Sequence, residues 1–319
     1  MGDTEGVNMA NYLITGGAGF IGSNIVQALL ERGQTVRVLD NFATGRRENL
    51  AEFENRIELI EGDIRDLALA ERAVEDVDYV LHQAALGSVP RSVQDPLTSN
   101  AVNVNGTLNL LWAAKKAGVK RFVTASSSSV YGNTPQLPKA ESMLLNPISP
   151  YAVSKLACER YTLSFHAVYG LPTVALRYFN VFGPKQDPTS QYAAVIPRFI
   201  TALKHGRSPV VYGDGEQSRD FTYIDNVVQA NLSACTATAA VGYAMNIACG
   251  ERYSLNTLLQ LLAEIMGKNV PAVYEPERSG DVKHSLASIE RAQHLLNFSP
   301  LVNFREGLKR TVAWFLQNS

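Results

Sequence analysis

Two residues in the middle of the chain, Tyr151 and Lys155, have the types and spacing of a proton-transfer pair. They lie in the segment SPYAVSKLACERY, and residues four apart on a helix share one face, so the ammonium is expected beside the phenol. A phenol is a poor base at neutral pH because the ordinary pKa of tyrosine is about 10, and a nearby cation stabilises the phenolate. The same pattern also occurs as an ordinary surface pair. A run of serines, Ser126–Ser129, follows an apolar segment earlier in the chain and strengthens the prediction of a base assisted by a hydroxyl group.

Three glycines near the N-terminus, Gly16, Gly19 and Gly22, lie between an apolar run and a helical pattern. Without side chains in the way, a pyrophosphate can approach the N-terminus of the helix, and the third glycine lets helix and strand pack closely. A glycine-rich turn alone is weak support, but Asp40 ends the next apolar run, about 20 residues beyond the loop. These residues together predict a dinucleotide-binding site.

The carboxylate of Asp40 decides which dinucleotide is expected. It can accept hydrogen bonds from a ribose 2′-hydroxyl and repels a 2′-phosphate, so NAD is predicted rather than NADP. The neighbouring Arg46 and Arg47 leave NADP as an alternative. Asp63, in the segment GDIRD, is a candidate for contact with the adenine edge, although an aspartate in this context can also simply form a turn.

These groups must be positioned by alternating strands and helices. Apolar runs that predict strands fall in residues 11–17, 35–40, 57–63, 77–85, 120–129 and 173–180. Helical patterns occupy residues 19–33 and 104–119 between them. This alternation predicts an α/β fold, a Rossmann-type doubly wound parallel sheet with helices on both faces.

The character of the sequence changes after Asn180. Residues 182–192 are rich in Gly, Pro, Asp and Ser and predict an irregular loop, and the remainder predicts a smaller mixed α+β lobe. The expected domains are 1–180, an NAD-binding Rossmann domain with residues 1–10 as a disordered tail, and 181–319, a substrate-binding lobe. Part of 220–250 is expected to return to the first domain.

The composition excludes several classes of protein. Lys and Arg number 29 against 30 Asp and Glu, so no general positive field favours nucleic acid. No apolar stretch approaches the roughly 20 residues that cross a bilayer, and the acidic N-terminus is not a signal peptide, so no membrane association and a cytoplasmic location are expected. The 3 cysteines and 5 histidines show no ligand spacing that predicts a metal site. His82, after an apolar run, is expected to be structural rather than a base.

Taken together, GGAGFIG, Asp40, the serines before VYG, the Tyr151–Lys155 pair and LRYFNVFGP resemble the extended short-chain dehydrogenase/reductases. The segments HQAALGSVPRS, YAAVIPRFI, GDGEQSRDF and RSGDVKHS are similar to those of UDP-hexose 4-epimerases, and most similar to the subgroup that acts on UDP-N-acetylglucosamine. The resemblance runs from about Tyr12 to the C-terminus. It implies an isomerase that oxidises C4 of a UDP-sugar with tightly bound NAD, lets the 4-keto sugar turn, and reduces its other face.

The resemblance assigns roles residue by residue. Tyr151 would be the base at the sugar 4-hydroxyl, Lys155 would hold the nicotinamide ribose, and Ser127 would be the catalytic hydroxyl, with Ser128 as an alternative. The cofactor-binding set is expected to be Gly16, Gly19, Phe20, Ile21, Gly22, Asp40, Asn41, Asp63, Ile64, Gln83, Ala84, Lys155 and Tyr178. The substrate-binding set is expected to be Gly87, Ser88, Ser127, Ser128, Tyr151, Asn180, Ala194, Val195, Tyr212, Arg219, Arg278, Asp281 and Ser285. In this set Arg219, Arg278 and Asn180 would contact the diphosphate, Tyr212 the uracil and Asp281 a ribose hydroxyl.

Four positions bear on the reaction. Similar dehydratases carry an Asp-Glu pair where this chain has Ser128 and Ser129, and similar decarboxylases keep a Glu in place of Ser129. Similar uronate 4-epimerases have an Arg in place of Asp187, which could hold a C6 carboxylate that Asp187 would repel. In epimerases restricted to glucose and galactose, a bulky Tyr occupies the position of Ser285. The expected reaction is therefore interconversion of UDP-GlcNAc and UDP-GalNAc, and also of UDP-glucose and UDP-galactose.

Other functions stay open at this stage. They are a strict UDP-glucose/UDP-galactose 4-epimerase, a UDP-uronate 4-epimerase, a nucleotide-sugar reductase that consumes its cofactor, and a nucleotide-binding protein without catalysis. Helices around Leu108–Lys116 and Tyr151–Tyr161 resemble those that pair across the two-fold axis of homodimers in this family, so a homodimer is expected.

Overall fold

The computed structural model describes residues 9–188, 194–268, 270–277 and 283–318. Its main element is a sheet of seven strands in the order β11-β6-β5-β4-β1-β2-β3, and every neighbouring pair in it is parallel. The strands are β1 (Asn11–Thr15), β2 (Thr35–Asp40), β3 (Ile57–Glu61), β4 (Tyr79–His82), β5 (Arg121–Ser127), β6 (Thr173–Tyr178) and β11 (Ala244–Ile247). The predicted doubly wound parallel sheet is confirmed.

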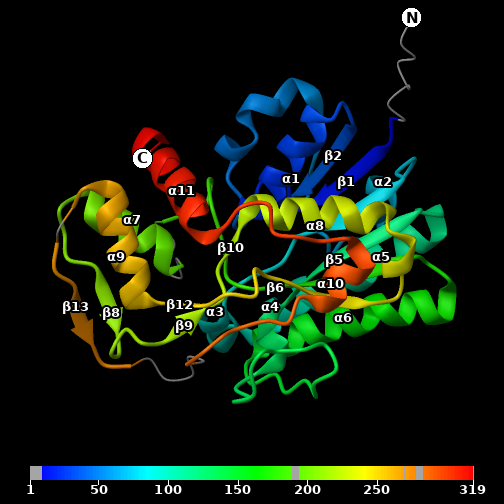
Figure 1. Cartoon of the computed structure of the whole chain (residues 1–319). Helices are drawn as coiled ribbons and strands as arrows, with labels where there is room; N and C mark the ends of the chain where they lie inside the picture. Colours follow the sequence, from blue (N-terminus) through cyan, green and yellow to red (C-terminus); the bar gives the residue numbers. More distant parts are fainter. Residues whose placement is uncertain (1–8, 189–193, 269, 278–282, 319) are drawn as a thin grey trace, which may run out of the picture.

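Helices cover both faces of this sheet (Figure 1). One face carries α1 (Phe20–Glu31) and α8 (Ile224–Thr236), and the other carries α2 (Leu67–Ala73), α5 (Gly106–Ala117) and α6 (Pro150–Tyr169). Successive side chains of a strand point to opposite faces, which explains why both layers are apolar. In β1, for example, Tyr12 and Ile14 join the core under α1 and α8, whereas Leu13 joins the core under α5.

The order of the strands reverses between β1 and β4. From β1 the chain goes to β2 and β3 on one side, and it then crosses back to β4, β5, β6 and β11 on the other. In open parallel sheets the carboxyl ends of the strands at such a reversal form a crevice that binds ligands. Here β1 leads into the glycine loop, and β4 leads into Gln83 and Ala84.

The helices that line this crevice begin with sequence signals. The hydroxyl of Ser149 caps α6 by accepting a hydrogen bond from the backbone N–H of Ala152, at 3.2 Å, and Pro150 occupies the first turn. Gly170 ends α6 in a left-handed conformation with a φ of 69°. Before α6 come two short helices, α3 (Val89–Gln94) and α4 (Pro96–Asn100), and a π-helical stretch, Ala101–Asn105, leads into α5.

The C-terminal part forms a smaller mixed layer beside the sheet. Figure 1 shows α7, α9 and the β8–β13 pair grouped at one end of the molecule. The remaining strands form two-stranded pairs, β10–β7 and β13–β8 parallel and β12–β9 antiparallel. Their bounds are β7 (Val181–Phe182), β8 (Val210–Tyr212), β9 (Ser218–Arg219), β10 (Thr222–Tyr223), β12 (Tyr253–Ser254) and β13 (Val273–Glu275). Its helices are α7 (Val195–Lys204), α9 (Leu255–Met266) and α11 (Phe304–Asn318), whereas α10 (Glu290–Leu296) packs against β11 and α8 of the first layer.

The chain returns to the first layer after residue 220, through α8 and the edge strand β11. The boundary near residue 180 stays a prediction, as does the N-terminal tail, because residues 1–8 lie outside the described part. The N–H of Ala10 donates to Oε1 of Gln34 at 3.0 Å, so the chain is already attached there. No helix among the described residues combines the length and the apolar character that crossing a bilayer requires.

Candidate active site

A cavity of about 500 Å³ lies at the reversal point of the sheet. Its walls come from the loops after β1, β2, β3 and β4, from Ala125 and Ser126 near the end of β5, and from the first turns of α1 and α6. It is lined by every residue predicted to bind the cofactor, namely Gly16, Gly19, Phe20, Ile21, Gly22, Asp40, Asn41, Asp63, Ile64, Gln83, Ala84, Lys155 and Tyr178. Gly87, Ser88 and Tyr151, from the predicted substrate set, line it as well.

The glycine loop packs closely against its neighbours. A Cβ atom on Gly16 would lie 2.7 Å from the backbone N of Ala84, and one on Gly22 would lie 2.2 Å from the carbonyl O of Gly16, so neither position tolerates a side chain. No side chain within the described part of the chain caps α1, and its first turn contains no acidic residue. The N-terminus of α1 therefore offers backbone N–H groups and positive dipole charge to an anion.

Asp40 closes the end of β2 beneath this loop. Its two carboxylate oxygens accept hydrogen bonds from the backbone N–H groups of Ala18, at 2.9 Å, and Phe42, at 2.8 Å. Burial raises the pKa of Asp40, and these two hydrogen bonds oppose the rise. Because a carboxylate has about four acceptor positions, Asp40 can still accept hydrogen bonds from a ribose in the cavity that it lines.

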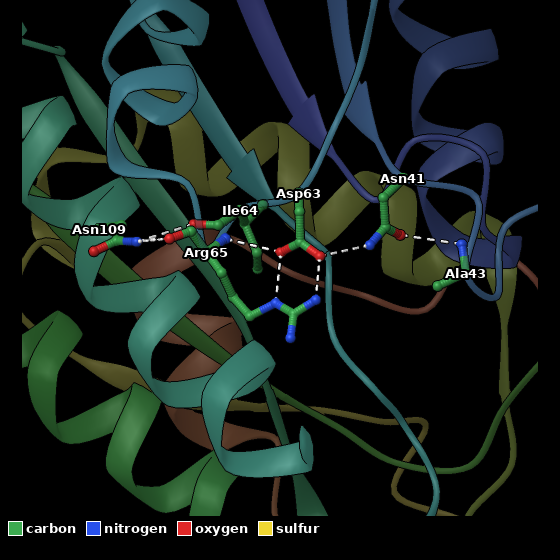
Figure 2. A network of polar contacts seen from close by, with 6 residues as sticks. All are labelled: Asn41, Ala43, Asp63, Ile64, Arg65 and Asn109. Atoms are coloured by element: carbon green, nitrogen blue, oxygen red, sulfur yellow. Dashed lines mark hydrogen bonds and ion pairs between the residues drawn. The ribbon is translucent and has the colours of Figure 1, made fainter. Parts of the chain in front are cut away.

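Asp63 is already engaged by a neighbouring arginine (Figure 2). The guanidinium of Arg65 donates to Oδ1 of Asp63 at 2.9 Å and to Oδ2 at 2.7 Å, and Nδ2 of Asn41 donates to Oδ2 at 2.9 Å. The hydrogen bonds from Arg65 lower the pKa of Asp63 to about 2, so it is an anion at neutral pH. Asn109 of α5 donates to the carbonyls of Ile64 and Arg65 and fixes the segment from behind. The predicted adenine contact of Asp63 would therefore share its carboxylate with Arg65.

Tyr151 and Lys155 occupy the first turns of α6 and line the same cavity. The backbone N–H of Tyr151 donates to Oγ of Ser92 at 3.0 Å, while its half-buried side chain reaches the cavity. Lys155 is buried, and its ammonium donates to the carbonyl O of Ala125 at 2.9 Å. Ala125 belongs to β5, so this bond ties α6 to β5 two residues before Ser127, the predicted hydroxyl group.

Ser127 and Ser128 lie where β5 ends, and both are half-buried. Oγ of Ser127 accepts a hydrogen bond from the N–H of Ser129 at 3.2 Å and caps the short 3₁₀ turn Ser128–Tyr131. Neither serine lines the cavity in this conformation. Ser126, which belongs to the predicted serine cluster but was assigned no role of its own, does line it. The catalytic role of Ser127 stays a prediction.

A buried charged network holds α6 against β5 and β6. Glu159, one turn beyond Lys155, forms a two-pronged ion pair with Arg177, whose Nε and Nη2 lie 2.8 and 2.7 Å from the carboxylate oxygens. Ser126 donates to the same carboxylate at 2.8 Å, and Arg177 also donates to the hydroxyl of Tyr131 at 2.7 Å. Sequence reasoning missed this network because its members come from four different elements.

Two further polar groups support the cavity wall. Tyr178 and Gln83 both donate a hydrogen bond to Oδ1 of Asn231 in α8. The distance is 3.0 Å from the Tyr178 hydroxyl and 3.1 Å from Nε2 of Gln83. His82 is buried between the hydroxyls of Thr15 and Thr107, at 2.7 and 2.8 Å. Burial lowers the pKa of His82 to about 3, so its imidazole is neutral and structural, as predicted.

Part of the predicted substrate set lies together in the structure, although these residues do not line the cavity. Nδ2 of Asn180 donates to the carbonyl O of Asp220 at 3.1 Å and to Oγ of Ser285 at 3.4 Å. Ser285 in turn donates its backbone N–H to the carbonyl O of Ser218 at 3.0 Å. Arg219 follows Ser218 in β9 and donates to the carbonyl O of Lys283 at 3.0 Å. Residues about 100 positions apart in the chain are thus in contact.

The other predicted substrate residues are more dispersed. Tyr212 ends β8 with the guanidinium of Arg198 5.5 Å from its ring centre, and Ala194 and Val195 begin α7. Arg278 and Asp281 lie outside the described residues, so their predicted roles stay predictions. Ser88 caps α3, and a Cβ atom on Gly87 would meet open space, so the cavity is roomy on that side.

Several cavity-lining residues have side chains that sequence reasoning did not assign, namely Thr44, Arg65, Arg91 and Thr98. Only Arg65 carried a local signal, because it shares the GDIRD segment with Asp63. Within the described ranges, no group of three or more His, Cys, Asp or Glu residues could hold a metal ion.

Comparison with known proteins identifies the family. Residues 12–248 match the sequence profile of the NAD dependent epimerase/dehydratase family. The chain belongs to this family. It is an enzyme, and NAD is its cofactor.

The similarity extends over nearly the whole chain. A UDP-glucose 4-epimerase from Mycolicibacterium smegmatis is 39% identical over 311 residues, which are 96% of this chain and 99% of that protein. A solved UDP-N-acetylglucosamine 4-epimerase from Methanobrevibacter ruminantium, in complex with UDP-N-acetylmuramic acid, superposes with a TM-score of 0.93 at 44% identity, covering 98% of this chain and 99% of that one. A Thermus thermophilus UDP-glucose 4-epimerase in complex with NAD has a TM-score of 0.88 at 38% identity, covering 97% of this chain and 100% of that one.

Proposed function

We propose that this enzyme is a UDP-sugar 4-epimerase. The observation that carries the proposal is the single cavity that joins the glycine loop and Asp40 to Tyr151 and Lys155. When bound, NAD supplies a hydride acceptor and donor. The protein supplies the proton transfer, with Tyr151 removing the proton of the 4-hydroxyl and Lys155 keeping a positive charge beside it. Because a hydride leaves and returns, an epimerase consumes no cofactor.

The serines after β5 favour epimerisation over elimination. A dehydratase or decarboxylase on this fold needs a carboxyl group there, and this chain has Ser128 and Ser129. A hydroxyl group neither donates nor accepts protons comparably at neutral pH. Asp187 lines the cavity, and an acidic residue at this position disfavours a uronate, whose C6 carboxylate it would repel.

The preferred sugars are UDP-GlcNAc and UDP-GalNAc, with UDP-glucose and UDP-galactose also accepted. Ser285, beside Asn180, has a small side chain where a tyrosine would exclude a 2-acetamido group by overlap. Gly87 leaves open space on the cavity wall. A roomy pocket need not reject the smaller hexose, so both pairs are substrates. Asn180 and Arg219, with Arg278, are proposed to hold the diphosphate, Tyr212 to contact the uracil, and Asp281 to contact a ribose hydroxyl.

The first experiment is to incubate the purified protein with UDP-GlcNAc without added NAD and to follow the anomeric signals by NMR. Appearance of UDP-GalNAc supports the epimerase, its retained cofactor and the acetamido pocket together. If UDP-glucose alone reacts, the argument from Ser285 is wrong. If neither reacts with NAD added, or if NADH accumulates in proportion to product, a binding protein or a reductase is the better account.

The sugar preference is tested by Ser285→Tyr. We expect loss of activity on UDP-GlcNAc by at least about 100-fold, with UDP-glucose activity retained, because steric overlap acts on the larger sugar only. The matched control is Ser288→Tyr, the same substitution at a serine three residues further along the chain, which is not predicted to contact the sugar. Equal loss on both sugars in Ser285→Tyr would contradict the proposal.

We also propose that the enzyme is a homodimer. Apolar side chains are exposed on the short helices beside α6 and on α6 itself, among them Val93, Leu97, Val153 and Tyr161. Leu97 is 82% exposed and Val93 is 64% exposed. Two neighbouring short helices of a monomer rarely expose apolar side chains to this extent. Sedimentation of the wild-type protein should give a dimer, and Leu97→Glu should shift it to a monomer. A monomeric wild-type protein at micromolar concentration would exclude this proposal.

A further inference from the structure

The segment Gly183–Pro188, which we call the 183–188 loop, crosses from the C-terminal layer to the glycine loop. Its backbone is unusual, because Lys185 has a φ of 69°, in the left-handed region that non-glycine residues rarely adopt. Gly183, with a φ of 156°, lies so close to Ile224 that a Cβ atom would approach it to 2.5 Å. A strained conformation of this kind persists only when surrounding contacts hold it.

The side chain of Lys185 provides the first of these contacts. Its ammonium donates to the carbonyl O of Asn49 at 3.3 Å and lies 4.8 Å from the ring centre of Phe53. Asn49 is itself attached to the glycine loop, since its Nδ2 donates to the carbonyl O of Ala18 at 2.8 Å. Burial lowers the pKa of Lys185, in keeping with its half-buried position. Lys185 therefore connects the 183–188 loop to the segment that supports the glycine loop.

A second contact lies on the other side of the loop. Nδ2 of Asn24, in the second turn of α1, donates to the carbonyl O of Pro184 at 3.2 Å and to that of Phe20 at 2.8 Å. Phe20 is the first residue of α1 and lines the cavity, as does Asp187 at the end of the 183–188 loop. The 183–188 loop is thus fastened at Asn24 of α1 and at Asn49, which itself contacts the glycine loop.

We propose that Lys185 is a cofactor-retaining residue, which fastens the 183–188 loop across the glycine loop and slows the release of NAD. The proposal rests on NAD as the cofactor and is independent of the sugar. Release of a dinucleotide from a crevice requires the segments that cover it to separate. Here separation breaks the Lys185 and Asn24 hydrogen bonds and exposes the Lys185–Phe53 contact.

The test compares Lys185→Met with Lys309→Met. Methionine keeps an unbranched apolar chain against Phe53 and removes the ammonium, and Lys309 is an exposed lysine of α11 that serves as the matched control. The measurement is the exchange rate of bound NAD against excess deuterium-labelled NAD, followed by mass spectrometry of the extracted nucleotide. No sugar is added, so the outcome is separate from the fate of the proposed reaction.

We expect exchange at least about tenfold faster in Lys185→Met, because a hydrogen bond from a charged donor is lost. NAD content after dialysis should fall in the same variant, while Lys309→Met keeps the wild-type values. Asn24→Ala should accelerate exchange in the same direction and provides the test if Lys185→Met does not fold. Exchange within twofold of wild type in the folded variant, or in Asn24→Ala where Lys185→Met does not fold, would overturn the proposal.

Discussion

Breaking the buried ion pair between Glu159 and Arg177 is expected to lower the stability of the fold strongly. The side chain of Glu159 is 0% exposed and that of Arg177 is 3% exposed, and the carboxylate accepts three hydrogen bonds, two from Arg177 and one from Ser126. Glu159→Gln keeps the shape but removes the charge that neutralises Arg177. The amide NH₂ of glutamine must also face a donor.

The magnitude follows from this burial. Removal of one partner of a buried pair leaves an uncompensated charge and costs about 3–5 kcal/mol, well above the 0–1 kcal/mol of an exposed pair. At roughly 2 °C per kcal/mol for a chain of this size, the melting temperature should fall by about 6–10 °C. The control is Asp225→Asn, which breaks the Arg310–Asp225 pair of 3.2 Å, whose side chains are 48% and 45% exposed.

The assay is thermal unfolding followed by circular dichroism, with NAD in excess for every variant so that cofactor loss does not add to the result. The reasoning predicts a large fall for Glu159→Gln and a change below about 2 °C for Asp225→Asn. If the two variants melt within 2 °C of each other, burial does not set the strength of this pair and the argument is wrong. Ser126→Ala, which removes a single hydrogen bond, should give a loss of about 1 kcal/mol.

Three further predictions concern the cofactor, the catalytic helix and a buried acid. Asp40→Asn should reduce the ratio of NAD affinity to NADP affinity by about tenfold or more, because the repulsion of a 2′-phosphate is removed. Both affinities are measured by calorimetry. Lys155→Met should lower kcat by at least about 100-fold in the NMR assay, since its ammonium lies in the cavity wall. Burial raises the pKa of Asp220 from 3.8 to about 6, although three hydrogen bonds from backbone N–H groups oppose the rise. The folded state therefore holds this proton more tightly than the unfolded state, and the free energy of unfolding should fall by about 3 kcal/mol as the pH rises from 3.8 to about 6. Asp220→Asn should flatten that slope.

Each of these has a contrary result. An unchanged ratio of NAD to NADP affinity in Asp40→Asn would assign the discrimination to other residues. Lys155→Met with wild-type kcat would remove the ammonium from the mechanism. For Asp220, denaturation midpoints are compared between pH 4 and 6.5, and a wild-type curve that is flat, or a variant curve with the same slope, would show that another group titrates.

Local patterns in the sequence determined the first layer of this protein. The alternation of short apolar runs and helical patterns predicts the sheet, because each strand needs apolar residues on both faces and each helix needs one apolar stripe. The glycine loop, Asp40, and the Tyr151–Lys155 pair are recognisable for the same reason. Their chemistry depends on spacings of a few residues within one element or one turn, so it can be recognised from a short stretch of sequence.

Only the tertiary structure decided how distant segments complete the site. The contact of Asn180 with Ser285, the network of Glu159 and Arg177, and the attachment of Lys185 to Asn49 all join residues from different elements. Such pairs leave no periodic signal, because the energy of a contact depends on where the fold brings the two groups and on how far it excludes water. A single lysine in a glycine- and proline-rich loop has the character of a surface residue in the sequence. The fold places the Lys185 side chain against Phe53, and this contact is part of the basis for the proposed role.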